Sequence, residues 1–172
     1  MLVVADTTPL ISLIKIKRLS ILERLFRQVL VPEAVYNELT TNISFVEESR
    51  QFAECGFIQR VSSIDSRYVK LLRETTGLDL GESEAIAYAD SEGADVLLID
   101  EIKGRRIASS MGLPIMGTIG VLLASFQDGV STAVDVEKDL INLKQNNRYI
   151  SNELFQYALR KIHMNADDTE GA

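Results

Sequence analysis

Short runs of aliphatic and β-branched residues alternate with longer stretches of helical periodicity along the whole chain. The runs expected to form strands are 2–5, 29–31, 57–61, 95–99 and 114–116. Helices are expected from Thr8 onward and over 19–26, 32–39, 45–53, 64–73, 81–92, 102–111, 119–126, 134–145 and 152–164. Because helices separate the strands, crossovers join them into a mainly parallel sheet that is covered on both faces. The alternation therefore predicts the α/β class, with Thr8 as the N-cap of the first helix and Pro9 at its first position.

The length of the chain, 172 residues, corresponds to one domain of roughly 100–200 residues. No internal repeat or linker interrupts the pattern, so we expect a single domain over 1–164. The last residues, 165–172, are small and polar, and we expect them to form a disordered tail.

Composition excludes several classes of protein. Cys55 and His163 are the only residues of their types, so an intrachain disulfide and a metal cage of cysteine and histidine are both excluded. No apolar stretch approaches the roughly 20 residues of a membrane span, and the start lacks the basic region of a signal peptide. We therefore expect a cytoplasmic protein with no membrane partner. The 18 basic and 25 acidic residues give a net charge of −7, which excludes broad basic docking on nucleic acid.

Acidic residues directly follow two of the predicted strands. Asp6 ends the first strand, and Asp100 and Glu101 end the fourth. Because the carboxyl ends of parallel strands lie at one edge of a sheet, these side chains can meet there. Carboxylates placed together among apolar strands repel one another and need a cation. We expect Asp6 and Asp100 to bind that cation, with Glu101 in a supporting position; the alternative is that each aspartate only caps the next helix.

Three glutamates extend the acidic set. Glu38 lies near the end of a predicted helix, and Glu82 shares a helical face with residues expected to pack on the sheet. Glu84 is about 200° further round the same helix, so Glu82 and Glu84 cannot both reach one atom. We favour Glu82 as a ligand and keep Glu84 as a candidate for a second ion or a supporting role. A solvated face for Glu38 and a helix-dipole role for Glu84 are the alternatives.

Oxygen ligands without cysteine or histidine select Mg²⁺ or Mn²⁺ over Zn²⁺. Mg²⁺ in such a site keeps several waters and leaves positions for a substrate phosphate. Two such ions can activate water and stabilise the leaving oxygen of a phosphodiester. The acidic set therefore predicts metal-assisted phosphodiester hydrolysis.

Several segments of the sequence carry a family resemblance. They are Val-Val-Ala-Asp-Thr-Thr-Pro-Leu at 3–10, Val-Pro to Glu-Leu at 31–39, Gly-Glu-Ser-Glu-Ala-Ile at 81–86, Leu-Ile-Asp-Glu to Gly-Arg at 98–105, and the glycine-containing segments 112–114 and 117–122. Together they resemble PIN-domain proteins, most closely the prokaryotic branch related to VapC-type toxins. The resemblance runs from residue 3 to about residue 130.

The resemblance implies a three-layer α/β/α PIN-like fold with a mainly parallel central sheet, and divalent-metal-dependent cleavage of RNA. The residues to which it assigns catalysis and metal binding are Asp6, Glu38, Glu82 and Asp100. It also implies that Thr7 positions a water molecule, and it favours keeping Glu84 as a further ligand.

Two groups of residues remain as candidates for binding. Lys103, Arg105 and Arg106 follow Asp100 closely and are candidates for contacting a substrate phosphate, with Arg105 favoured and a solvated helix face as the alternative. The first two predicted helices carry more apolar residues than a pair of short helices must bury. We therefore expect a homo-oligomer, with a dimer as the favoured state. These apolar residues are Leu13, Ile14, Leu22 and Leu25.

The leading hypothesis is a Mg²⁺- or Mn²⁺-dependent ribonuclease, the toxin of a type II toxin–antitoxin pair, with RNA as substrate and a cognate antitoxin as partner. The alternative is a catalytically silent PIN-fold protein that binds nucleic acid or protein. A phosphohydrolase of the haloacid dehalogenase type is less favoured, because that chemistry uses a second aspartate two residues after the first, where this chain has Thr8.

Overall fold

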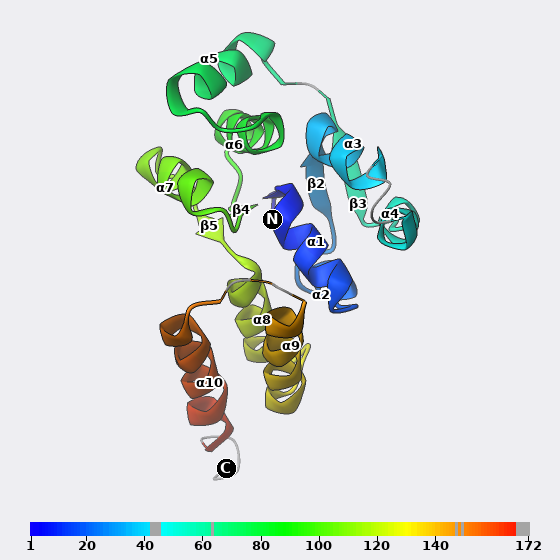
Figure 1. The fold of residues 1–172 in the computed structure, drawn as a ribbon, viewed down its shortest axis with the longest axis vertical. Coiled ribbons are helices and arrows are strands. Elements are labelled where there is room, and N and C mark those ends of the chain that lie inside the picture. The colour runs from blue at the N-terminus through cyan, green and yellow to red at the C-terminus, as the bar shows by residue number, and fades with distance from the viewer. Residues whose placement is uncertain (42–45, 63, 147, 149, 168–172) are drawn as a thin grey trace.

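The computed structural model describes residues 1–41, 46–62, 64–146, 148 and 150–167 (Figure 1). Its elements are β1 (Val3–Ala5), α1 (Thr7–Lys15), α2 (Ser20–Phe26), β2 (Val29–Pro32), α3 (Glu33–Thr41), α4 (Val46–Ala53), β3 (Ile58–Val61), α5 (Ser66–Thr76), α6 (Leu80–Glu92), β4 (Val96–Leu98), α7 (Ile102–Ser110), β5 (Ile115–Met116), α8 (Thr118–Gln127), α9 (Ala133–Gln145) and α10 (Asn152–Asp167). Each predicted strand and helix is present, with described ends within three residues of the prediction.

The five strands form one parallel sheet in the order β3-β2-β1-β4-β5. The central strand β1 pairs with β2 through Val4 and Leu30, and with β4 through Ala5 and Leu98. Successive strands from β1 to β3 proceed toward one edge of the sheet, whereas β4 and β5 lie on the other side of β1. Such a reversal of strand order opens a crevice at the carboxyl ends of the strands, where ligands bind in open α/β sheets. Here the reversal lies between β1 and β4.

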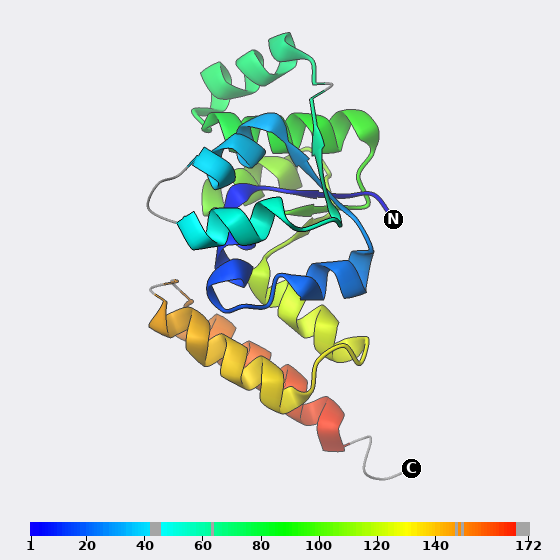
Figure 2. The ribbon, with the colours of Figure 1, turned by 90° about the vertical axis from the view of Figure 1, so that its right-hand side faces the viewer.

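Alternate residues of the central strand enter two separate hydrophobic cores. Val3 and Ala5 contribute to a core with α1–α4 and α8–α10, whereas Val4 contributes to a core with α5, α6 and α7. Figure 2 shows α5 and α6 on one side of the sheet and α8, α9 and α10 on the other. Burial on both faces explains why the strands are almost continuously apolar in sequence. The fold is a three-layer α/β/α sandwich around a parallel sheet, as the sequence and the resemblance implied.

The start of α1 differs from the prediction. The N-cap is Asp6 rather than Thr8, and Pro9 is the third residue of the helix. Proline is tolerated there because the first N–H groups of a helix have no intrahelical partner. The earlier start places the Asp6 carboxyl group directly between the end of β1 and the first turn of α1.

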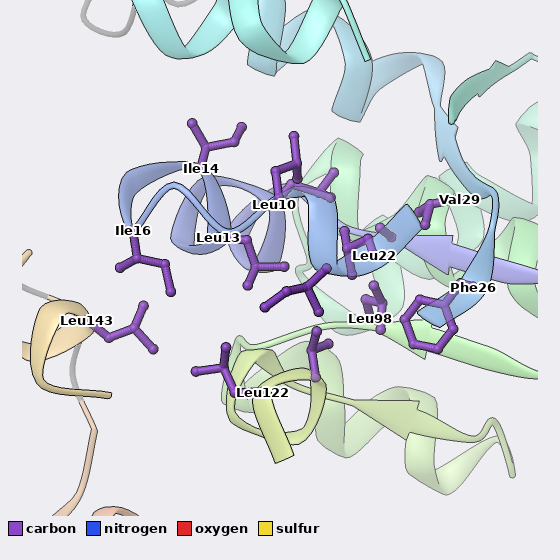
Figure 3. Packing of buried hydrophobic residues seen from close by; sticks show 14 of the residues in the cluster. Leu10, Leu13, Ile14, Ile16, Leu22, Phe26, Val29, Leu98, Leu122 and Leu143 are labelled. Carbon is purple, nitrogen blue, oxygen red and sulfur yellow. The ribbon is translucent and has the colours of Figure 1, made fainter. Parts of the chain in front are cut away.

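The apolar residues of α1 and α2 are covered by the chain itself. Leu13, Ile14 and Leu22 are buried, and they belong to one core with residues of α8 and α9. In Figure 3, Leu13 and its neighbours face Leu122 of α8 and Leu143 of α9. The reasoning that led from these side chains to an oligomer surface was therefore wrong, because the C-terminal helices supply the missing cover. The oligomeric state itself remains a prediction.

An ion pair between partly exposed Arg18 and buried Asp139 joins these C-terminal helices to the rest of the molecule. Arg18, in the turn between α1 and α2, lies 2.8 Å from the Asp139 carboxylate of α9. The same guanidinium donates a hydrogen bond of 2.6 Å to the Ser131 hydroxyl. Arg24 donates to the carbonyl of Val130. The turn before α9 is thus held by two arginines from the α1–α2 region.

The C-terminal end of the chain is helical further than expected. Helix α10 continues to Asp167, so the first three residues of the predicted tail belong to it, while 168–172 lie outside the described residues. Among the helices that the structure describes, none has the length and apolar character needed to cross a bilayer.

Candidate active site

Asp6 is the most deeply buried acid of the predicted set. It follows the central strand, and its backbone N–H donates to the carbonyl of Leu98 on β4. The pKa of Asp6 is raised from 3.8 to about 7: burial is the largest cause, the charges of Glu82 and Asp79 also raise it, and the backbone N–H groups of Thr7 and Thr8 oppose the shift. A carboxyl group with acids as its charged neighbours is stabilised by any cation that enters the site.

Glu82 reaches this position from the first turn of α6. Its N–H donates to Asp79 Oδ1 at 2.8 Å, and its own Oε2 accepts from the Asp79 N–H at 3.3 Å, which together form a capping box. Burial is the largest cause that raises the pKa of Glu82; the charges of Asp79 and Glu101 add to it, and Lys103 opposes it. Helix α6 therefore brings two acids, rather than one, to Asp6.

Asp79 is absent from the predicted site residues. The sequence did contain a signal for its capping role, because aspartate followed three residues later by glutamate before an apolar helix is a capping-box pattern. Its proximity to Asp6 depends on the packing of α6 against the sheet, which the pattern does not show.

Glu38 enters the site from α3. Its Oε2 accepts a hydrogen bond of 2.7 Å from the buried Thr7 hydroxyl. A Cβ atom built on Gly81 would lie 3.5 Å from the same Glu38 oxygen and 3.6 Å from Asp79 Oδ1, so both acids border the start of α6. Thr7, which the resemblance linked to a water molecule, thus fixes the carboxylate of Glu38.

Asp100 lies at the end of the strand next to Asp6, and its carboxylate is held by the start of α8. Oδ1 accepts the Thr118 N–H at 2.8 Å, and Oδ2 accepts the Thr118 hydroxyl at 2.5 Å. Thr118 was not predicted to have a role. A hydrogen bond between residues 18 apart, in two different elements, leaves no periodic signal in a sequence.

Two glycines allow the close packing around these acids. A Cβ atom on Gly104 would lie 2.9 Å from Glu82 Oε1 and 2.5 Å from Ile99 Cδ1. A Cβ atom on Gly117 would lie 2.7 Å from Asp100 Oδ1 and 3.0 Å from the Arg105 guanidinium. Both distances to the acids are shorter than real Cβ contacts, so any side chain at either position displaces a carboxylate of the site.

The remaining acids lie differently. Glu84 turns away from Glu82, as helix geometry predicted, and its Oε2 accepts the Ala34 N–H at 2.9 Å, which caps the first turn of α3. Glu101 is exposed at the N-cap position of α7. The structure therefore gives Glu84 a bond to α3, whereas its predicted part in metal binding remains untested.

The three basic candidates lie on α7. Arg105 donates to the carbonyl of Ile99 at 2.8 Å, and Lys103 donates to the carbonyl of Gly77 at 2.7 Å. Arg106 is exposed. Arg105 is thereby fixed next to the end of β4, and its contact with a substrate phosphate remains a prediction.

The donors of the site suit a hard divalent cation. All are oxygen atoms, and Asp6 and Glu82 are buried carboxyl groups whose pKa values are raised. Within the described residues, no three side chains of histidine, cysteine, aspartate or glutamate are already gathered around a single metal position. Mg²⁺ commonly uses only one or two carboxylates and completes its coordination with water and substrate phosphate. Asp6 and Glu82 fit that requirement. Glu38 borders the start of α6, and Asp100 follows the strand next to β1.

The comparison with protein families agrees with the fold. A family model described as a PIN domain matches residues 2–164 of the chain. Neither the curated proteins nor the solved structures that were searched gave a match. PIN domains are commonly nucleases that use divalent metals. Because the family model covers nearly the whole chain, the chain belongs to the PIN-domain family.

Proposed function

We propose that the protein is a Mg²⁺- or Mn²⁺-dependent ribonuclease that hydrolyses RNA phosphodiester bonds. One observation carries the proposal: Asp6 is buried at the carboxyl end of β1, next to β4, with Glu82 and Asp79 as its charged neighbours. A buried anionic cluster of this kind costs folding free energy unless a cation offsets it. Proteins retain such arrangements at functional sites.

Asp6 and Glu82 are the residues that would hold the cation, and Asp100 and Glu38 extend the site on either side. A bound divalent ion supplies positive charge for the scissile phosphate and activates a water for attack. Thr7 orients the carboxylate of Glu38, which can then accept a proton from the attacking water. Thr118 holds Asp100 in one orientation.

Arg105 and Lys103 serve the substrate in this proposal. Their bonds to the carbonyls of Ile99 and Gly77 fix both side chains at the rim of the acidic site. Positive charge there offsets the repulsion between the acids and a phosphodiester. Fixed donors also orient the phosphate without a large loss of side-chain entropy.

We further propose that the chain is the toxin of a type II toxin–antitoxin pair, acting in the cytoplasm and forming a homodimer. The resemblance of the sequence motifs to VapC-type toxins supports this role. Growth arrest on expression of the chain, relieved by the neighbouring gene product, is the expected result. Growth unaffected by an active ribonuclease would contradict the toxin role.

A second function has support from the site itself. Both oxygens of Asp100 accept hydrogen bonds from Thr118, and the described acids contain no preformed three-ligand group. A catalytically silent PIN-fold protein that binds nucleic acid or protein would have this appearance.

Cleavage of single-stranded RNA with Mg²⁺ or Mn²⁺ separates the two functions. We expect metal-dependent cleavage by the native chain, and a loss of at least about 100-fold in Asp6→Asn and Glu82→Gln, more than outer-shell substitutions cause at metal sites. Glu92→Gln is the matched control, because Glu92 is exposed at the other end of α6. Equal cleavage by native chain and both variants would rule out the metal site, and binding without cleavage would favour the silent module.

A further inference from the structure

Helix α10 carries an apolar stripe on a face that the described part of the chain leaves exposed. Leu154 is 41% exposed, Tyr157 is 45% exposed and Met164 is 69% exposed. The helix packs against α8 and α9 through a different face, which includes the buried residues Ala158 and Ile162. Figure 1 shows α10 beside α8 and α9, at the opposite end of the molecule from α5. Several large apolar side chains on one exposed helix face indicate a contact with another molecule.

The spacing of the stripe is that of a coiled-coil seam. Steps of three, four and three residues separate its members, as at positions a, d, a and d of a heptad: Leu154, Tyr157, Lys161 and Met164. The ammonium group of Lys161 lies 5.7 Å from the centroid of the Tyr157 ring, so the lysine shares the face of the apolar residues. A single lysine at position a costs stability but specifies the register and the number of helices. The stripe, called the α10 seam below, therefore favours one defined partner helix.

Two opposite charges border the α10 seam on one side. Glu153 directly precedes Leu154, and Arg160 directly precedes Lys161, so Glu153 and Arg160 both occupy position g. Among the residues that the structure describes, neither of these two side chains has an ion-pair or hydrogen-bond partner. Charges at this position set the partner and the orientation of a coiled coil.

A second copy of the chain is the partner that these charges fit. A two-fold axis perpendicular to α10 brings the same side of both seams together, so position g of one helix faces position g of the other. Glu153 of each copy then lies opposite Arg160 of the other, and Leu154 of each copy packs against Tyr157 of the other. A parallel pair would instead place Lys161 against Lys161 of the second copy, and like charges repel.

We propose that two copies of the chain associate through the α10 seam in antiparallel orientation, with Glu153 of each copy paired with Arg160 of the other. This inference rests on the homodimer of the proposed function and names its surface. Stable interfaces bury about 800 Å² on each partner, more than the exposed face of one helix of 16 residues provides. We therefore expect a reversible dimer with a dissociation constant of about 1–100 µM.

Sedimentation velocity over a range of protein concentrations measures this association without RNA. We expect the native chain to shift from monomer to dimer as the concentration rises. Tyr157→Ser should weaken the association at least about tenfold, because it removes the largest side chain of the seam. The matched control is Ile141→Ser on α9, whose side chain is 42% exposed and which should associate like the native chain. Circular dichroism checks that both variants keep the fold.

Reversal of the flanking charges tests the orientation. Glu153→Arg and Arg160→Glu should each weaken self-association, because like charges then face each other across the two-fold axis. An equimolar mixture of these two variants should form a dimer again, because each chain then supplies the charge that the other lacks. A mixture that stays monomeric would overturn the antiparallel pairing.

A native chain that stays monomeric at its highest soluble concentration would overturn the proposal, and so would a dimer that is unaffected by Tyr157→Ser. A monomer whose α10 seam binds a different protein would reject the second copy as the occupant. Cleavage of RNA by a monomeric chain would reject the dimer and uphold the ribonuclease function. A dimer with the expected pattern and without cleavage would uphold the seam and reject the ribonuclease function.

Discussion

Asp6 and Asp139 are almost equally hidden from solvent, with 3% and 5% of their surface exposed, but their neighbours are opposite. Asp139 lies 2.8 Å from the Arg18 guanidinium, whereas the charged neighbours of Asp6 are Glu82 and Asp79. The Asp139–Arg18 pair joins α9 to the turn between α1 and α2. The acids around Asp6 repel its carboxylate and lower the stability of the fold until a cation binds. The comparison shows that burial of an acid identifies a site only when its partners are also known.

Stability as a function of pH tests the Asp6 side of this comparison. The pKa of Asp6 rises from 3.8 to about 7 on folding, so its stabilisation is complete below pH 4 and is lost as the pH rises through 7. We expect metal-free protein to be about 2–3 kcal/mol less stable at pH 8 than at pH 5 from this group, measured by urea unfolding. Asp6→Asn should flatten the dependence, and Mg²⁺ should stabilise the native chain more at pH 8 than at pH 5.

Burial also raises the pKa values of Glu82 and Asp139, so these groups contribute to the pH dependence of stability as well. The contribution of Asp6 is therefore the difference in that pH dependence between the native chain and Asp6→Asn. Parallel pH curves for the two proteins would show that Asp6 ionises without a cost, and the contrast with Asp139 would disappear.

Removing the carboxylate of Asp139 should lower the stability of the protein, because this carboxylate has a cationic partner. Asp139→Ala removes the ion-pair partner of Arg18, and because Arg18 is partly exposed we expect a loss of about 2 kcal/mol, below the 3–5 kcal/mol of a fully buried pair. Thermal unfolding measures it, and RNA cleavage below the melting temperature should be unchanged. The double variant Arg18→Met/Asp139→Leu should recover most of the stability. A fully stable Asp139→Ala would mean that the ion pair does not fasten α9.

Asp100 is an intermediate case, because neutral groups of Thr118 satisfy its carboxylate. Thr118→Val removes the hydroxyl and keeps the N–H, and we expect a loss of about 1 kcal/mol in stability. The cleavage rate should fall severalfold, with kcat affected more than KM, and Thr118→Ser should restore both. Unchanged kcat in Thr118→Val would show that the orientation of Asp100 is unimportant for the reaction.

Much of the fold was predictable from the sequence, because buried parallel strands are short apolar runs and the helices between them have clear periodicity. The error at α1 arose because proline fits several positions of a first turn, so Pro9 did not identify Thr8 as the cap. The oligomer reasoning was wrong because periodicity shows that Leu13 and Leu22 are buried, but not which helix covers them.

The site was predictable to a smaller extent. Parallel topology brings Asp6 and Asp100 to one edge, and helix geometry separates Glu82 from Glu84; both features can be derived from residue order. The contributions of Asp79 and Thr118 could not be derived in this way. They depend on the angle at which α6 and α8 meet the sheet, which is determined by side-chain packing throughout two cores.

Helix α8 connects the acidic site to the C-terminal helices. Its first residue, Thr118, holds the Asp100 carboxylate, while Val121 and Leu122 share a core with residues of α9 and α10. A protease cut or a bulky fusion in the C-terminal helices would therefore change the orientation of Asp100, although it contacts none of the acids. An affinity tag is accordingly better placed away from α10, since a tag that tilts α8 alters the orientation of Asp100.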